Sequence, residues 1–162
     1  MSILELVKSR RSVRRYQDKP IAKADLENIL EAARLAPSAH NAQEYKIVVV
    51  QDGFARERLS EAAGQPFIAS APAILVGVAT NPQSKYHAID LAIAFDHISL
   101  TAWSLGIGSC WIGAFGNDEV REAISAPEGC RVVVLMPLGY PADRELPKRR
   151  KPLAELVSRD KL

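Results

Sequence analysis

The chain has 162 residues, of which 48% are hydrophobic and 25% charged, and its formal net charge is +2. This length fits one domain with a sizeable core, and this composition excludes disordered, collagen-like and fibrous proteins. The charge is unevenly spread: residues 8–19 carry six Lys or Arg against one acid, and residues 148–162 carry six against two, whereas residues 20–147 carry nine basic against fifteen acidic residues. Both ends are therefore basic, and the body between them is acidic.

The two cysteines, Cys110 and Cys130, are too few for a disulfide scaffold and lack the spacing of zinc ligands. The N-terminus lacks the apolar segment of a signal peptide, and no run of 18 apolar residues indicates a membrane-spanning helix. We therefore expect a cytoplasmic protein with no membrane partner and with free thiols. Cys110 lies among apolar residues and is expected to be buried and unreactive.

Helices and strands are predicted throughout the first half of the chain. Apolar residues at helical spacing predict a short helix at residues 3–7 and an amphipathic helix of about 13 residues that ends near Ala36, because Pro37 follows. Four elements come next: a polar loop over 37–43, a strand over Tyr45–Gln51, a helix over 54–63 and a strand over Ala73–Ala79.

The segment from Tyr86 to Leu105 carries the strongest pattern. Its apolar residues form one helical stripe over about 20 residues, and further apolar residues lie on the other faces. Such a helix is buried, either within the domain or against a partner chain. Gly106 and Gly108 are expected to end it.

The last third of the chain predicts two more strands around a short helix. The expected elements are an apolar strand over Ser109–Phe115, a helix of about seven residues capped by Asn117, a strand over Arg131–Leu138, and helical spacing after the basic residues from Lys148. We therefore expect one α+β domain over residues 1–162 with a four- or five-stranded sheet. A strictly alternating parallel fold is disfavoured, because the long helix precedes two strands separated by only a short helix.

Several site classes are excluded by spacing. The pair Gly106 and Gly108 is no dinucleotide motif, because Trp111 stands where the third glycine belongs and a helix precedes the pair. Asp90 and His97 stand ~10.5 Å apart along a helix, too far to share a metal ion. No phosphate-binding loop of the GxxxxGK[ST] type and no specific catalytic triad is present. We expect no metal site.

The basic N-terminal run favours a phosphate site. Arginine guanidinium groups bind phosphate bidentately, and Ser12 adds a hydroxyl donor. The second basic cluster, Lys148–Lys151, strengthens this interpretation, since two ends converging on one phosphate would explain the charge distribution. The alternatives are a solvated charged face and a nucleic-acid site, and the acidic body argues against the latter. The polar loop from Ser38 to Gln43 suits a heterocycle with donors and acceptors on one edge, or is an ordinary connection.

Five segments together resemble the nitroreductase family of FMN-dependent oxidoreductases, in particular its shorter members. They are Arg-Arg-Ser-Val-Arg (10–14), Pro-Ser-Ala-His-Asn-Ala-Gln (37–43), Gly-Ile-Gly-Ser-Cys-Trp-Ile-Gly-Ala-Phe (106–115), Pro-Leu-Gly-Tyr-Pro (137–141) and Lys-Arg-Arg-Lys-Pro-Leu (148–153). The resemblance implies an α/β sandwich with a central, mostly antiparallel sheet of four to five strands flanked by helices. It also implies a homodimer with FMN at the interface, NAD(P)H as co-substrate and a small-molecule electron acceptor, with no nucleic-acid partner.

The resemblance further implies which residues contact FMN. Arg10 and Ser12 would hold the phosphate and ribityl chain, and Arg14 would lie near flavin N1 and the C2 carbonyl. The expected cofactor-binding set is Arg10, Arg11, Ser12, Arg14, Pro37, Ser38, Asn41, Gln43, Trp111, Ile112, Gly113, Ala114, Lys148 and Arg150. Within it, residues 37–43 would come from the second subunit, residues 111–114 would present main-chain N–H groups to flavin N5, and Lys148 and Arg150 would contact the phosphate.

Other basic residues are not needed for that phosphate. Arg15, Arg149 and Lys151 are expected on a solvated face, and the same alternative stands for Arg11. The sequence also departs from the family pattern. Gly113 occupies a position that is acidic in some members, and the short stretch between Ala63 and Pro72 predicts that the lid of larger members is absent.

The implied activity is ping-pong electron transfer, in which NAD(P)H delivers a hydride to the flavin and a nitroaromatic, quinone or similar acceptor is then reduced. The flavin carries this chemistry, so no catalytic side chain is expected. Two alternatives keep the cofactor: another flavin reaction, such as dehalogenation, dehydrogenation or flavin fragmentation, and a non-catalytic flavin-binding protein. A third is nucleic-acid binding through the basic ends.

Overall fold

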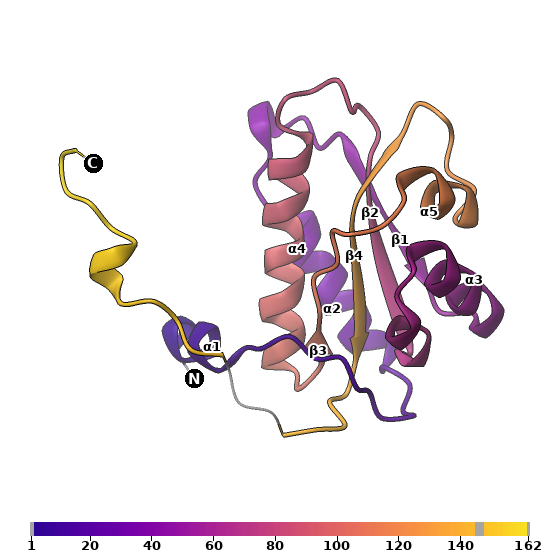
Figure 1. The fold of residues 1–162 in the computed structure, drawn as a ribbon, viewed down its shortest axis with the longest axis horizontal. Helices are drawn as coiled ribbons and strands as arrows, with labels where there is room; N and C mark the ends of the chain where they lie inside the picture. Colours follow the sequence, from indigo (N-terminus) through magenta and orange to yellow (C-terminus); the bar gives the residue numbers. More distant parts are fainter. Residues whose placement is uncertain (1, 145–147, 162) are drawn as a thin grey trace.

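The computed structural model describes residues 2–144 and 148–161. In this part of the chain, four strands form one antiparallel sheet in the order β1-β2-β4-β3, with helices on both faces (Figure 1). The strands are β1 (Tyr45–Val50), β2 (Ala73–Ala79), β3 (Gly108–Ser109) and β4 (Arg131–Gly139). The α-helices are α1 (Ile3–Ser9), α2 (Lys23–Arg34), α3 (Gly53–Ala63), α4 (His87–Ser104) and α5 (Asn117–Ala123), and the 3-10 turns are η1 (Ala39–Asn41), η2 (Pro66–Ser70) and η3 (Leu153–Glu155). The α+β prediction is confirmed, with four strands.

The sheet separates two apolar cores because side chains alternate between its faces. On β2, Leu75 packs with α2 and α4, whereas Ile74 and Val76 pack with α3 and α5. Every residue of β2 is buried, so this central strand has the continuous apolar sequence of a strand covered on both sides. The prediction of a strand over Ala73–Ala79 therefore matches the structure residue for residue.

Helix α4 covers one face of the sheet, as Figure 1 shows, and α2 packs beside it. The predicted stripe is buried at Leu91, Ala94, Phe95, Ile98 and Ala102. Ile89 lies 55% exposed on another face of the helix. The apolar character that extends round α4 thus leaves some apolar surface uncovered by the chain itself.

The predicted strand over Ser109–Phe115 is wrong in extent. Only Gly108 and Ser109 form ladder pairs with β4, and the chain then meets the sheet again at a single bridge, where Ile112 and Leu135 exchange two main-chain hydrogen bonds of 3.0 Å. Apolar composition alone could not show that the neighbours of Ile112 turn outwards: Trp111 is 41% exposed.

Asn117 does not cap α5, contrary to the prediction. It is the first residue of the helix, and Gly116 precedes it. Its side-chain amide donates to the carbonyl of Val132 at 2.7 Å, so it ties the start of α5 to β4. The predicted helix length of seven residues is confirmed.

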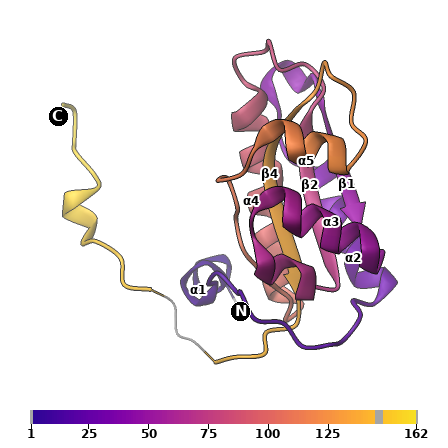
Figure 2. The ribbon, with the colours of Figure 1, turned by 45° about the vertical axis from the view of Figure 1, so that its right-hand side comes forward.

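The C-terminal residues 148–161 extend away from the body as an exposed arm, which Figure 2 shows from a second direction. The helical spacing predicted there gives one 3-10 turn, η3, with no buried residue. Among the described residues, no helix is long and apolar enough to cross a membrane.

A substitution at Gly77 tests the packing of the sheet against α4. A Cβ at this position would lie 2.7 Å from Phe95 Cε2 and 2.7 Å from Val134 Cγ1, both in the buried core. We expect Gly77→Ala to lower the free energy of unfolding by about 1–3 kcal/mol, because the core has no room for the methyl group. Chemical denaturation measures this change. Gly129→Ala is the matched control, since a Cβ there meets no atom within 4 Å; equal stability of the two variants would contradict the packing argument.

Candidate functional site

The N-terminal basic segment runs in extended form beside β3. The amide of Val13 donates to the carbonyl of Ser109 at 2.8 Å, and Ser12 forms a parallel bridge with Ser109. Successive side chains of an extended segment point to opposite sides. Accordingly Arg11 and Val13 are buried, whereas Arg10, Ser12 and Arg14 are half-buried or exposed.

Tyr16 holds the end of this segment in place. Its hydroxyl donates to the carbonyl of Val13 at 2.6 Å and lies 3.5 Å from that of Pro137. Burial raises the pKa of the Tyr16 hydroxyl far above its ordinary value, with smaller effects from neighbouring charges. The hydroxyl therefore stays protonated and serves as a donor.

Arg10, Ser12 and Arg14 affect the charge state of the Cys110 thiol. Burial raises the pKa of Cys110. The positive charges of Arg14 and Arg10 and a hydrogen bond from Ser12 lower it by smaller amounts. The net effect keeps the thiol neutral, as expected from the sequence for a buried, unreactive cysteine.

A cavity of about 160 Å³ opens beside these residues. Its lining consists of Arg14, Gln65, Phe67 and Cys110 to Ala114. The structure thus brings Arg14 together with the predicted residues Trp111, Ile112, Gly113 and Ala114. Sequence patterns did not indicate Gln65 and Phe67, because the stretch between Ala63 and Pro72 carries no motif.

Main-chain donors in this cavity are found at three of the four predicted positions. The amide of Ile112 donates to the carbonyl of Leu135 and its side chain belongs to the core, so its main chain is occupied by the sheet. The amides of Trp111, Gly113 and Ala114 have no acceptor among the described residues, and all three residues are exposed. These three N–H groups are available to a bound ligand.

Arg11 lies on the opposite side of the segment from this cavity. Its Nη2 forms an ion pair with Asp143 Oδ1 at 2.5 Å and donates to the carbonyl of Asp143 at 3.0 Å. Its guanidinium carbon lies 5.9 Å from the ring centre of Trp103, whose indole N–H donates to Ser9 Oγ. The alternative of a solvated Arg11 is therefore wrong, because only 8% of the residue is exposed.

The polar loop at residues 37–43 lies apart from the cavity in the same chain. Ala39 donates to the buried carboxylate of Asp90 in α4 at 3.0 Å, and the ring of His40 meets Tyr86 edge-on. Three non-glycine residues of the loop have left-handed backbones, namely His40, Asn41 and Gln43. Pro37 and Asn41 are exposed and Ser38 is half-buried.

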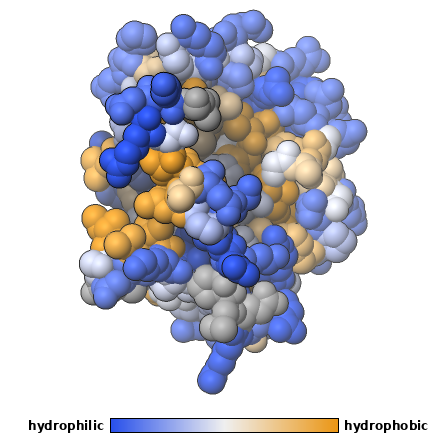
Figure 3. Space-filling view, turned by 60° about the vertical axis from the view of Figure 1, so that its left-hand side comes forward, coloured by the Kyte–Doolittle hydropathy of each residue, from blue (hydrophilic) through white to orange (hydrophobic). Residues whose placement is uncertain are grey.

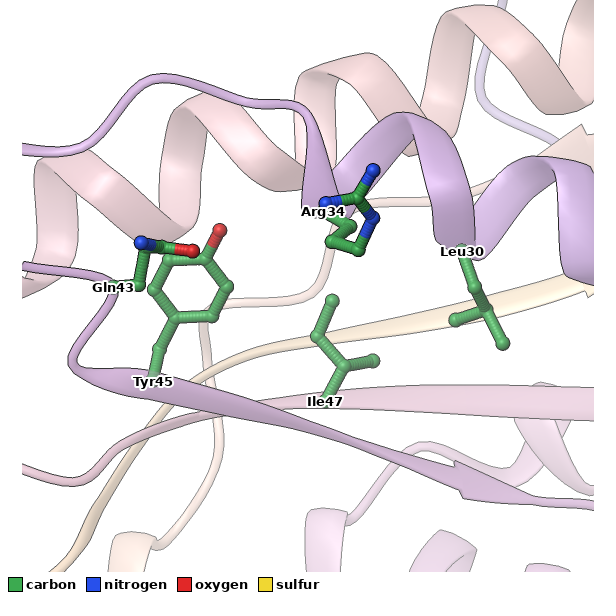
Figure 4. Close-up of a pocket in the computed structure, with 5 residues that line it drawn as sticks. All are labelled: Leu30, Arg34, Gln43, Tyr45 and Ile47. Carbon is green, nitrogen blue, oxygen red and sulfur yellow. The ribbon is translucent and has the colours of Figure 1, made fainter. Parts of the chain in front are cut away.

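Gln43 lines a different, shallow cavity of about 310 Å³ between α2 and β1, shown in Figure 4 with Arg34, Tyr45 and Ile47. The guanidinium of Arg34 is held by a two-pronged ion pair with Glu31. Among the described residues, none lines both this cavity and the cavity at Arg14, so Gln43 does not reach the predicted flavin site of its own chain.

Lys148 and Arg150 lie on the exposed arm. Arg150 donates to the carbonyl of Lys148 at 3.3 Å. In the part of the chain that the structure describes, no hydrogen bond links either side chain to Ser12.

The sequence matches the nitroreductase family over residues 7–70 and 61–140. An FMN reductase (NAD(P)H) of Bacillus subtilis strain 168 is 34% identical to this chain, over 91% of this chain and 70% of the reductase. An NADH dehydrogenase of Thermus thermophilus is 32% identical, covering 91% of both. An FMN-dependent nitroreductase of Clostridium difficile R20291 superposes with a TM-score of 0.92 at 28% identity, covering 98% of this chain and 99% of that one. The chain belongs to the nitroreductase family.

Replacing Arg11 by Met tests the buried ion pair. The variant leaves the Asp143 carboxylate, 5% exposed, without its closest cation, so we expect a loss of about 3–5 kcal/mol in the free energy of unfolding. Arg15→Met is the matched control, since Arg15 approaches the same carboxylate at 3.5 Å but is 71% exposed, and we expect ~0–1 kcal/mol. Chemical denaturation compares the two, and similar losses would refute the structural role of Arg11.

Proposed function

We propose that the protein is an FMN-dependent oxidoreductase that takes a hydride from NAD(P)H and reduces a nitroaromatic, quinone or similar acceptor by a ping-pong mechanism. The observation that carries the proposal is the set of free N–H groups at Trp111, Gly113 and Ala114, three residues that line the cavity together with Arg14. Membership of the nitroreductase family, and the names of relatives such as the FMN reductase of Bacillus subtilis, support the choice of cofactor.

The chemistry of these donors suits FMN. A phosphate takes charge-assisted hydrogen bonds from arginine and serine, which assigns Arg10 and Ser12 to the phosphate end. The isoalloxazine edge carries acceptors that Gly113, Ala114 and Arg14 can serve. FMN, when bound, supplies the hydride acceptor and electron donor. The chain binds and orients it, and the neutral thiol of Cys110 offers no competing nucleophile.

The site in one chain is too small for the whole cofactor, which supports a homodimer. The cavity measures only about 160 Å³, and the loop carrying Ser38, Asn41 and Gln43 does not line it. We assign this loop to contacts with the flavin bound by a second copy of the chain. We assign Lys148 and Arg150 to contacts with the FMN phosphate. The cytoplasmic location expected from the sequence belongs to the same proposal and is supported by the free thiols.

Uncovered apolar surface also favours a second copy. Apolar residues gather on the face shown in Figure 3. The exposed large hydrophobic residues of the described chain include Ile3, Leu4 and Val7 on α1, Ile89 on α4, and Leu153, Leu156 and Val157 on the arm. Burial of such residues stabilises an association between chains.

The colour of the purified protein tests the proposal directly. We expect a yellow protein that contains FMN and bleaches when NADH or NADPH is added anaerobically, and that regains its colour when an acceptor follows. Absorbance spectroscopy with a panel of nitroaromatics and quinones checks this. A protein that binds no FMN refutes the proposal, and one that binds FMN but is not reduced is a non-catalytic flavin protein.

Removal of the Arg10 guanidinium tests the phosphate assignment. We expect Arg10→Ala to raise the dissociation constant for FMN roughly ten- to a hundredfold, the value of one charge-assisted hydrogen bond. Fluorescence titration of apoprotein with FMN measures it, and titration with riboflavin, which lacks the phosphate, should show no such difference. Lys8→Ala, an exposed cation two residues away, is the control. An unchanged FMN constant in Arg10→Ala would remove Arg10 from the site.

A further inference from the structure

Asp90 is a buried acidic residue that the proposed FMN-binding residues leave unexplained. It lies in the first turn of α4, and only 7% of it is exposed. Within residues 2–144 and 148–161 it forms no ion pair. A buried carboxylate without a cation costs free energy, so the apolar packing of α4 on the sheet does not account for an acid at this position.

The partner of Asp90 is the polar loop at residues 37–43. The main-chain amide of Ala39 donates to Asp90 Oδ1 at 3.0 Å, although the two residues stand 51 positions apart. One turn before Asp90, Tyr86 meets the ring of His40 edge-on, with the ring centres 6.3 Å apart. The start of α4 therefore holds the loop at two points.

The other hydrogen bonds of the loop are local. The amide of Asn41 donates to the carbonyl of Ser38 at 3.0 Å, and the amide of Gln43 donates to the Ser38 hydroxyl at 3.1 Å. In the part of the chain that the structure describes, Asp90 accepts the only hydrogen bond that joins residues 37–43 to an element distant in the sequence. The local bonds thus support the shape of the loop, and the bond to Asp90 fixes its place on the body.

The backbone of the loop needs such support. His40, Asn41 and Gln43 have positive φ angles of 54°, 54° and 53°. Non-glycine residues stay in this region only where the surrounding structure holds them there. Asn41 and Gln43 are also two of the residues that we assign to the flavin, so the direction in which they face depends on how the loop is held.

We propose that Asp90 is a positioning residue for the flavin site of the second copy. Its carboxylate holds Ala39 and thereby sets the direction in which Ser38, Asn41 and Gln43 face that flavin. Asp90 acts through the loop and does not itself contact FMN. The inference rests on the proposed function, from which it takes the assignment of the loop to the flavin bound by the other chain.

Removing either side of the hydrogen bond tests the proposal. Asp90→Leu keeps a side chain of similar size without the acceptor, whereas Ala39→Pro removes the donor. Proline suits position 39, since Ser38 before it is extended and Ala39 is the first residue of η1. We expect each variant to raise the dissociation constant for FMN roughly tenfold, the value of one hydrogen bond to a charged group. Fluorescence titration of the apoprotein with FMN measures this change.

A double variant and two controls separate positioning from a loss of stability. Asp90→Leu combined with Ala39→Pro should bind FMN no more weakly than either single variant, because both substitutions remove the same bond. Asp90→Asn keeps an acceptor oxygen and should stay within about threefold of the wild-type constant. Val120→Ala, a core substitution in α5 outside the loop and the cavity, should lower the free energy of unfolding and leave the FMN constant unchanged.

Heterodimers show which site each loop serves. When an Asp90→Leu chain pairs with an Arg10→Ala chain, one flavin site has its own Arg10 and an intact loop from the other chain, and the second site has neither. We expect this heterodimer, isolated with two different affinity tags, to bind one FMN with the wild-type constant, although each homodimeric variant binds FMN weakly. If Asp90 only stabilised its own chain, no site of the heterodimer would reach that constant.

The outcomes distinguish this inference from the proposed function. Unchanged FMN binding in Asp90→Leu, additive losses in the double variant, or a heterodimer without a wild-type site overturns the role of Asp90. The oxidoreductase proposal is judged separately, by the bleaching of the wild-type flavin with NAD(P)H, and a wild type that binds no FMN overturns both. If Asp90→Leu does not fold, Ala39→Pro and its heterodimer with Arg10→Ala decide the question in the same way.

Discussion

The buried ion pair between Arg11 and Asp143 fixes the N-terminal basic segment to the chain that follows β4, at one edge of the sheet. Two main-chain hydrogen bonds of 2.9 Å, from Ala142 to Arg15 and from Gln17 to Tyr140, continue this connection between the two segments. Two charges taken out of water cost free energy that only close geometry offsets, and here the pair is supplemented by a second hydrogen bond and by Trp103. Because Arg11 and Val13 point inwards, the alternate residues of the extended segment point outwards, and one of them, Arg14, lines the cavity. The buried ion pair thus also determines which way the side chains that we propose to bind FMN are turned.

The sequence predicted the elements whose pattern is local and strong. Strand β2 and helix α4 follow from a continuous apolar run and a long helical stripe, since each is decided by its own side chains. The segment after β3 could not be predicted in this way. Its apolar residues divide between the core, which takes Ile112, and the cavity wall, which includes Trp111, and that division depends on β4, which comes much later in the chain.

The residues of the candidate site could likewise be predicted only where a local motif marks them. Arg14 and residues 111–114 were found through motifs, and the structure places them around one cavity, whereas Gln65 and Phe67 carried no motif and became visible only through the fold. The ion pair of Arg11 could not be predicted from its neighbours in the sequence, because its partner, Asp143, stands 132 residues away. In an extended segment, side chains alternate between buried and exposed, so the position of Arg11 two residues before the apolar Val13 is the signal that its side chain turns inwards. A further cavity, lined by His87, Gly113 and Arg131 among other residues, follows from no sequence pattern, since its lining comes from three separate parts of the chain.

The left-handed residues of the loop at 37–43 bear on how this surface meets another molecule. His40, Asn41 and Gln43 hold a backbone region that non-glycine residues rarely occupy, at a cost of about 1–3 kcal/mol for each strained residue. The hydrogen bond from Ala39 to Asp90 and that from Gln43 to Ser38 offset part of this cost within the folded chain. The loop is therefore shaped before any contact forms. A surface that docks on it loses little conformational entropy in doing so, which makes the loop a rigid template.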